Sequence, residues 1–139
     1  MRRLVVVYLA ILIVLVGCQK EETISLDQVL SALVEQELHL EKSKVSKGDT
    51  IFGAKLYGEK PKTYLLNNKF FYIFIYDSNA DRIEALNKFK EKTALMNLLS
   101  FSIYEKDNML IFYVYEDHVI NKNIEIDDAI KEALNHLGG

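Results

Sequence analysis

Residues 64–76 read YLLNNKFFYIFIY, and this stretch decides the fold. Its second half is entirely aromatic or β-branched, which is typical of a strand at the centre of a sheet. Asn67 and Asn68 lie in its middle, and asparagine tolerates positive φ better than most residues. The stretch therefore predicts a tight two-residue turn that joins strands over residues 63–66 and 69–76 into a hairpin.

A second hairpin is predicted further along the chain. Residues 101–104 and 109–115 have the composition of strands, and the polar stretch 105–108 joins them. Residues 51–57 predict one more strand, because apolar side chains alternate there, and a turn with the only proline follows at 58–61. These segments supply one antiparallel sheet.

Three segments predict amphipathic helices. Residues 25–40 carry apolar side chains at helical spacing, and Ser25 and Gln28 match a capping box at the start. The element order α-β-β-β-α-β-β-α predicts an α+β fold, an antiparallel sheet of about four or five strands with helices packed mainly on one face. The second helix is expected over residues 80–93, capped by Ser78-Asn79, with Ile83, Leu86 and Phe89 on its inner face. The third is expected after the cap Asp127 and ends at Gly138, and its buried positions are Ile130, Ala133, Leu134 and Leu137.

The first eighteen residues form a separate unit of sequence. Arg2 and Arg3 precede an apolar run over residues 4–16. That run of about 13 residues has the length of the apolar region of a secretory signal, whereas a membrane span needs roughly 20. The run leads into Leu15-Val16-Gly17-Cys18, which contains the only cysteine of the chain.

This ending resembles the lipobox of bacterial lipoproteins. The resemblance implies that residues 1–17 are a cleaved signal peptide and that Cys18 carries a diacylglycerol on its sulfur. Residues 18–24 would then be the lipidated cysteine and a short tether, and residues 25–139 a single α+β domain. The implied location is the extracytoplasmic face of the cell membrane, held there by the lipid anchor. The alternative is an uncleaved N-terminal anchor with an incidental cysteine.

Composition excludes some classes of partner. The formal charge is −3, and it becomes about −5 without Arg2 and Arg3, so nucleic acid is not an expected partner. The same acidity argues against electrostatic adhesion to anionic lipid, so the acyl chains would carry the membrane attachment. The general plan of the domain also resembles small lipoproteins of Bacillus-like bacteria, on residues 64–68 and 111–115, and this resemblance transfers no function.

Catalytic and metal-binding patterns are missing from the sequence. Glu35 and His39 lie four residues apart on a predicted helix, and residues 116–118 read Glu-Asp-His, but the three histidines are scattered and no HExxH occurs. The sequence also lacks a GxSxG motif and a glycine-rich phosphate loop. We therefore expect no cofactor, no metal and no enzymatic activity.

The two strongest predicted strands carry four tyrosines. Tyrosine places an apolar body beside a polar tip, so a tyrosine-bearing sheet face could stay partly wet and bind a partner. The alternative is that the first or last helix packs over this face, or that the tyrosines ladder across strands. The candidate binding residues are Tyr72, Phe74, Tyr76, Ile111, Tyr113 and Tyr115.

The expected function is that of a non-enzymatic, membrane-anchored envelope lipoprotein that acts as a binding module, with another envelope protein as the expected partner. The alternative is an extracytoplasmic carrier or sensor of a small apolar or peptide ligand. A deep cavity lined by Tyr72, Phe74, Ile111 and Tyr113 would favour the carrier, and a flat surface would favour protein docking.

Overall fold

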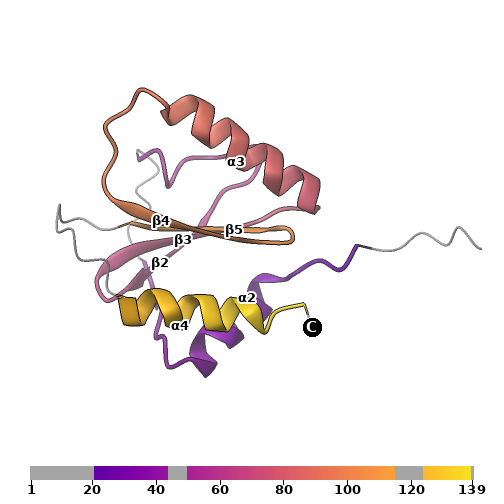
Figure 1. Ribbon diagram of the computed structural model, residues 1–139, viewed down its shortest axis with the longest axis vertical. Coiled ribbons are helices and arrows are strands. Elements are labelled where there is room, and N and C mark those ends of the chain that lie inside the picture. Colours follow the sequence, from indigo (N-terminus) through magenta and orange to yellow (C-terminus); the bar gives the residue numbers. More distant parts are fainter. Residues whose placement is uncertain (1–20, 44–49, 115–123, 139) are drawn as a thin grey trace, which may run out of the picture.

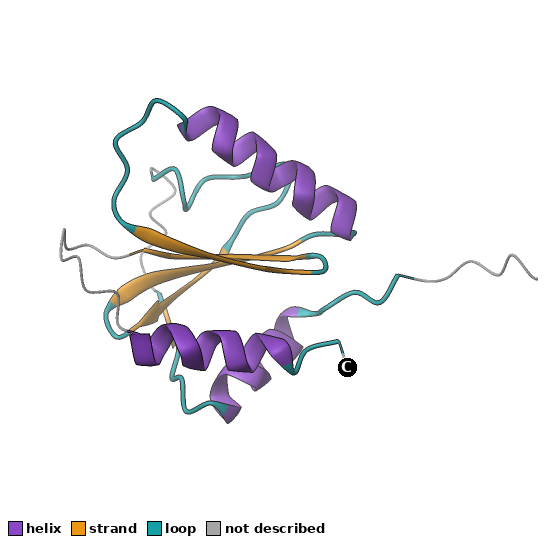
Figure 2. Ribbon diagram, viewed as in Figure 1, coloured by secondary structure: helices purple, strands orange, loops and turns teal. Residues whose placement is uncertain are grey.

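The computed structural model describes residues 21–43, 50–114 and 124–138, which form a sheet with helices on both faces (Figures 1 and 2). The observed order confirms the predicted α+β class. Among the described residues, none of the helices is long and apolar enough to cross a membrane. The elements are α2 (Leu26–Glu35), β1 (Glu41–Lys42), β2 (Lys62–Leu66), β3 (Lys69–Ile75), α3 (Asn79–Thr93), β4 (Phe101–Lys106), β5 (Met109–Val114) and α4 (Ile124–Asn135).

The five strands form one antiparallel sheet in the order β1-β2-β3-β5-β4. Two tight turns build it. Asn67 and Asn68 have φ of 51° and 61°, which confirms the predicted hairpin, and Asp107 at the β4–β5 turn has φ of 47°. The two hairpins join through β3 and β5, which are the central strands.

The register of β3 against β5 divides the core in two. Phe71 lies opposite Tyr113 and Tyr72 lies opposite Phe112, so odd-numbered residues of both strands share one face and even-numbered residues the other. α2 and α4 cover the odd-numbered face, and α3 alone covers the even-numbered face (Figure 1). The two-helix core includes Val29, Leu33, Phe71, Ile73, Met109, Ile111, Tyr113, Ile130 and Leu134; the α3 core includes Phe52, Tyr72, Phe74, Tyr76, Leu86, Phe89, Leu110, Phe112 and Val114.

α2 begins as predicted and ends early. The Ser25 hydroxyl accepts from the Gln28 amide at 3.3 Å, and the Gln28 side chain accepts from the Ser25 amide at 2.8 Å, which confirms the capping box. The helix stops at Glu35 instead of continuing to Leu40. Glu37 takes φ of 59°, which reverses the chain and returns Leu38 to the core.

The strand predicted over residues 51–57 was wrong. The Gly53 amide donates to the Thr50 carbonyl and hydroxyl, both at 3.1 Å, and this turn replaces sheet pairing. Phe52 packs instead against Phe101 and Phe112, with ring centroids 4.9 and 5.7 Å away. The strand that occupies this place in the order is the two-residue β1.

Two predicted helix positions also differ. Ile83 was expected on the inner face of α3 but is 45% exposed, because the buried stripe runs through Ala85, Leu86 and Phe89. Asp127 lies inside α4 and is not its cap. Its carboxylate accepts from the Tyr104 hydroxyl at 2.6 Å, so it serves the packing of α4 on β4.

Asn108 fastens the start of the domain to the β4–β5 turn. Its side chain is buried, accepts from the Ile24 amide at 2.6 Å, and donates to the carbonyls of Ile24 at 3.0 Å and Tyr76 at 2.8 Å. The Tyr76 amide in turn donates to the Asn108 carbonyl at 2.9 Å. One amide side chain thus joins three parts of the chain that are distant in sequence.

Replacing Asn108 by leucine should lower the free energy of unfolding by about 2–3 kcal/mol, because polar backbone groups lose their partners in a buried place. Urea unfolding followed by circular dichroism measures this. Asn87→Leu, on the exposed side of α3, is the matched control and should change stability by less than about 0.5 kcal/mol. An equal effect of the two substitutions would contradict the role assigned to Asn108.

Candidate functional site

The tyrosine-bearing face predicted as a binding surface is buried in the structure. Tyr72, Phe74 and Tyr76 lie under α3, whereas Ile111 and Tyr113 lie on the opposite face of the sheet. All five are at most 3% exposed. The prediction failed because the strands pair with Tyr72 opposite Phe112, which sets the tyrosines of β3 and β5 on different faces. Tyr115, the sixth predicted residue, lies outside the described residues, as does Cys18.

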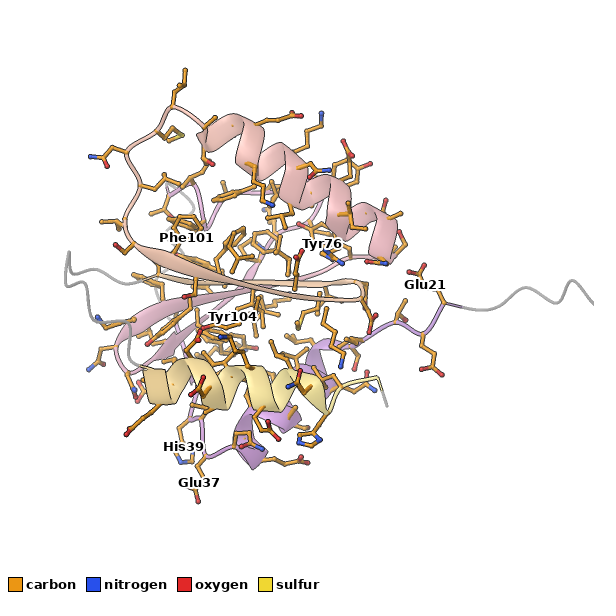
Figure 3. All side chains as sticks on the ribbon, in the orientation of Figure 1. Glu21, Glu37, His39, Tyr76, Phe101 and Tyr104 are labelled. Atoms are coloured by element: carbon orange, nitrogen blue, oxygen red, sulfur yellow. The ribbon has the colours of Figure 1, made fainter. Side chains whose placement is uncertain are left out.

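The buried tyrosine hydroxyls bond within the domain. The Tyr76 hydroxyl donates to the Leu56 carbonyl at 3.3 Å, and the Tyr113 hydroxyl donates to the Leu66 carbonyl at 3.4 Å. Burial, and secondarily the charge of Glu59, raises the pKa of Tyr76 well above its ordinary value. Figure 3 shows Tyr76 between the sheet and α3, and Tyr104 on the other side of the sheet. These rings build the two cores. The first and last helices, α2 and α4, cover Tyr113 as the alternative expectation has it, whereas Tyr72 and Tyr76 lie under the middle helix α3.

A pocket of about 190 Å³ opens at the end of the sheet where α3 finishes. We call it the end pocket. Its wall is mostly apolar, with Thr50, Tyr72 and Asn97 as its residues with polar side-chain groups, and the Thr50 hydroxyl lies 3.4 Å from the Tyr72 hydroxyl. Of the five predicted binding residues that the structure describes, only Tyr72 lines it. The lining residues are Thr50, Ile51, Phe52, Phe70, Tyr72, Asn97, Leu98, Leu99 and Val114.

The volume of the end pocket limits what it can hold. Pockets for drug-sized ligands enclose about 300–1,000 Å³, so about 190 Å³ suits one large side chain or a very small molecule. Phe52, Leu98 and Leu99 come from two loops, and no sequence pattern indicates that these loops meet. Aromatic packing of Phe52 on Phe89, at 5.7 Å between centroids, fixes the inner wall.

An exposed apolar segment adjoins the end pocket. We call residues 94–100, between α3 and β4, the apolar loop. Leu95 is 101% exposed, and Met96 and Leu99 are also exposed, while Leu98 packs against the α3 core. Leu99 lines the pocket as well, so the loop and the pocket form one continuous apolar area. Its signal in the sequence is the uncharged run that follows the lysine-rich end of α3.

No metal centre is found among residues 21–43, 50–114 and 124–138. Glu35 and His136 both line a shallow hollow between α2 and α4, but His136 pairs with Glu132 at 3.0 Å. His39, the other half of the predicted pair with Glu35, lies beside Glu37 on the outer side of α4 in Figure 3. His118 lies outside the described residues.

Alkaline pH should destabilise the domain through Tyr76. The folded state keeps this hydroxyl protonated because its pKa is raised, whereas the unfolded chain loses the proton near pH 10. The free energy of unfolding should therefore fall above about pH 10, by up to about 1.4 kcal/mol per pH unit for this group. Tyr76→Phe should make that fall shallower at a cost of about 1 kcal/mol at neutral pH. The free energy of unfolding of each protein is measured by urea titration at neutral and alkaline pH. An equal fall with pH in the wild type and in Tyr76→Phe would contradict the assignment.

Comparisons with known proteins provide no relative from which the site could be interpreted. No family model matches the chain, no curated protein matches it, and no solved structure matches it. The end pocket and the apolar loop are therefore interpreted from their residues. Their apolar walls, small volume and exposure at one end of the domain are typical of a place where another molecule inserts an apolar group.

Proposed function

We propose that the protein is a lipid-anchored lipoprotein of the bacterial envelope that acts by binding and not by catalysis. The anchor is Cys18, and the support for it is the basic start, the apolar run and the Leu-Val-Gly-Cys ending. The domain sits on the extracytoplasmic face of the cell membrane. Its partner is another envelope protein.

The end pocket is the observation that carries the binding role. Binding energy at protein interfaces concentrates in a few large side chains that fill desolvated pockets. The end pocket has the size for one such side chain, and Leu99, which is exposed and lines the pocket, provides apolar contact area for it. We propose that the partner inserts one large apolar side chain between Phe52 and Leu99.

The attachment limits where the partner can be. Ile24 is fixed to Asn108, and the stretch from Cys18 to Ile24 reaches at most about 20 Å when fully extended. The partner must present its apolar group within a short distance of the bilayer. A membrane protein, or a protein bound to one, meets this requirement.

A carrier of a small apolar ligand is the second candidate. The same pocket favours it, because its wall is mostly apolar and includes Thr50, Tyr72 and Asn97, whose polar groups could orient a ligand. The volume places a tight limit on that ligand, which must be smaller than a drug-sized molecule. The deep cavity lined by Tyr72, Phe74, Ile111 and Tyr113 that would favour a carrier is not formed, because these residues lie on two faces of the sheet.

Lipidation at Cys18 is tested by mass. Full-length protein isolated from membranes of a bacterial host should begin at residue 18 and carry a diacylglycerol there, because the lipid is added to the thiolate before cleavage. Cys18→Ala should keep an intact Met1 terminus. An intact Met1 terminus, or a free thiol at position 18, in the wild-type protein would refute the anchor.

Capture of the partner should depend on the pocket. Leu99→Glu, at an exposed position of the pocket wall, should reduce capture from cross-linked membranes roughly tenfold or more, since losing a central apolar contact costs at least about 1.4 kcal/mol. Val34→Glu, at an exposed apolar position on α2, is the matched control and should capture like the wild type.

Equal capture by both variants would place the partner elsewhere. A small apolar molecule that co-purifies with the wild type but not with Leu99→Glu, without any protein partner, would favour the carrier. Thermal melting of both variants verifies that each is folded.

A further inference from the structure

We infer that the apolar loop, together with the lysines at the end of α3, makes a second contact with the lipid bilayer. The inference rests on the proposed anchor at Cys18. It commits the exposed part of the loop to lipid and leaves the neighbouring end pocket to the partner.

The first end of α3 lies beside the point where the chain leaves for its anchor. The Asn79 amide, in the first turn of α3, donates to the Glu21 carboxylate at 3.0 Å. Cys18 lies three residues before Glu21, so the two Cα atoms are at most about 11 Å apart. Figure 3 shows Glu21 where the described chain ends.

Buried contacts hold this arrangement in place. Asn108 binds Ile24 through two hydrogen bonds, and the neighbouring Asp107 carbonyl accepts from Arg82 Nε at 2.9 Å. Arg82 belongs to the first turns of α3, donates to the Asn79 side chain at 2.7 Å and pairs with Glu105. The chain exit, the β4–β5 turn and the start of α3 are therefore linked, and the start of α3 must lie close to the bilayer that holds Cys18.

The apolar loop lies at the other end of the same helix (Figure 1). α3 has fifteen residues, so its ends are about 22 Å apart. When α3 lies along the bilayer, the tether and the loop both reach the surface. The exposed side of the helix then faces lipid headgroups, and its Ile83, 45% exposed, faces the same way as Lys90.

The apolar loop is uncharged, and the helix turns that precede it carry lysines, which is the arrangement that suits the boundary between acyl chains and headgroups. Residues 93–100 carry no charge, and Leu95 and Met96 project from the domain with 101% and 49% exposure. The preceding turns carry Lys88, Lys90 and Lys92. Lys88 pairs with Glu84 at 3.8 Å and with Glu91 at 3.7 Å, so the excess of positive charge comes from Lys90 and Lys92.

Apolar side chains can thus enter the boundary of the acyl chains while lysine ammonium groups stay among the phosphates. This end of α3 is positive in a chain that is acidic overall, so it matches anionic headgroups. A protein partner at Leu95 and Met96 would not explain why lysines occupy the helix turn next to an uncharged loop.

The chain contains no tryptophan, so Leu95→Trp introduces a single fluorescent reporter. The full-length lipidated variant is reconstituted into vesicles of phosphatidylcholine and phosphatidylglycerol in equal parts. Its emission should shift to shorter wavelength and should lose intensity when the acyl chains are brominated. Val34→Trp, an exposed position on α2 at the opposite layer, is the matched control and should show neither change. Lys90→Glu with Lys92→Glu, added to Leu95→Trp, should reduce the quenching.

Flotation with the vesicles reports the anchor independently. A Leu95→Trp variant that floats, is folded by circular dichroism and yet emits as in water, without quenching, overturns the inference while the anchor stands. A variant that fails to float refutes the anchor and the second contact together. Shielding of the introduced indole that needs an added membrane protein, and not lipid, assigns the loop to a protein partner and also overturns the inference.

Discussion

The pairing of β3 with β5 is the constraint on which the rest of the structure depends. Both strands are apolar on both sides, so the paired strands need cover above and below. Three helices supply it, two on one face and α3 on the other. Because helices cover both faces, neither face of the sheet is open in the part of the chain that the structure describes, and the end pocket lies at an end of the sheet.

Local features of the sequence predicted local structure well. The Asn67-Asn68 turn and the Ser25–Gln28 capping box each depend on a few neighbouring residues, and both are present. The distribution of tyrosines over faces depends on register between β3 and β5, which continuous apolar strands do not encode because neither face is marked by polar residues. The strand predicted at 51–57 failed for a related reason, since alternating apolar residues also occur where a turn inserts Phe52 into a core.

The candidate site combines segments that only the fold brings together. The end pocket takes Phe52 from one loop and Leu98 and Leu99 from another, and no sequence motif connects them. The whole-chain charge concealed a related asymmetry, because a chain with a charge of −3 still gathers lysines at the end of α3. Net charge describes the average surface, whereas contact with a membrane depends on one side of the molecule.

The hydrogen bonds of Asn108 have a mechanical consequence. In the lipid-anchored protein proposed above, a force pulling on the anchor would enter the domain first at Glu21, which bonds to Asn79, and then at Ile24. It meets Asn108 at once, and from there it spreads to Tyr76 on β3 and through the β4–β5 turn to Arg82 on α3. The pulling force would thus act on the central strands of the sheet before it could detach α2 from them. Under such a force the domain would unfold as one unit, and unfolding would not begin with α2 alone.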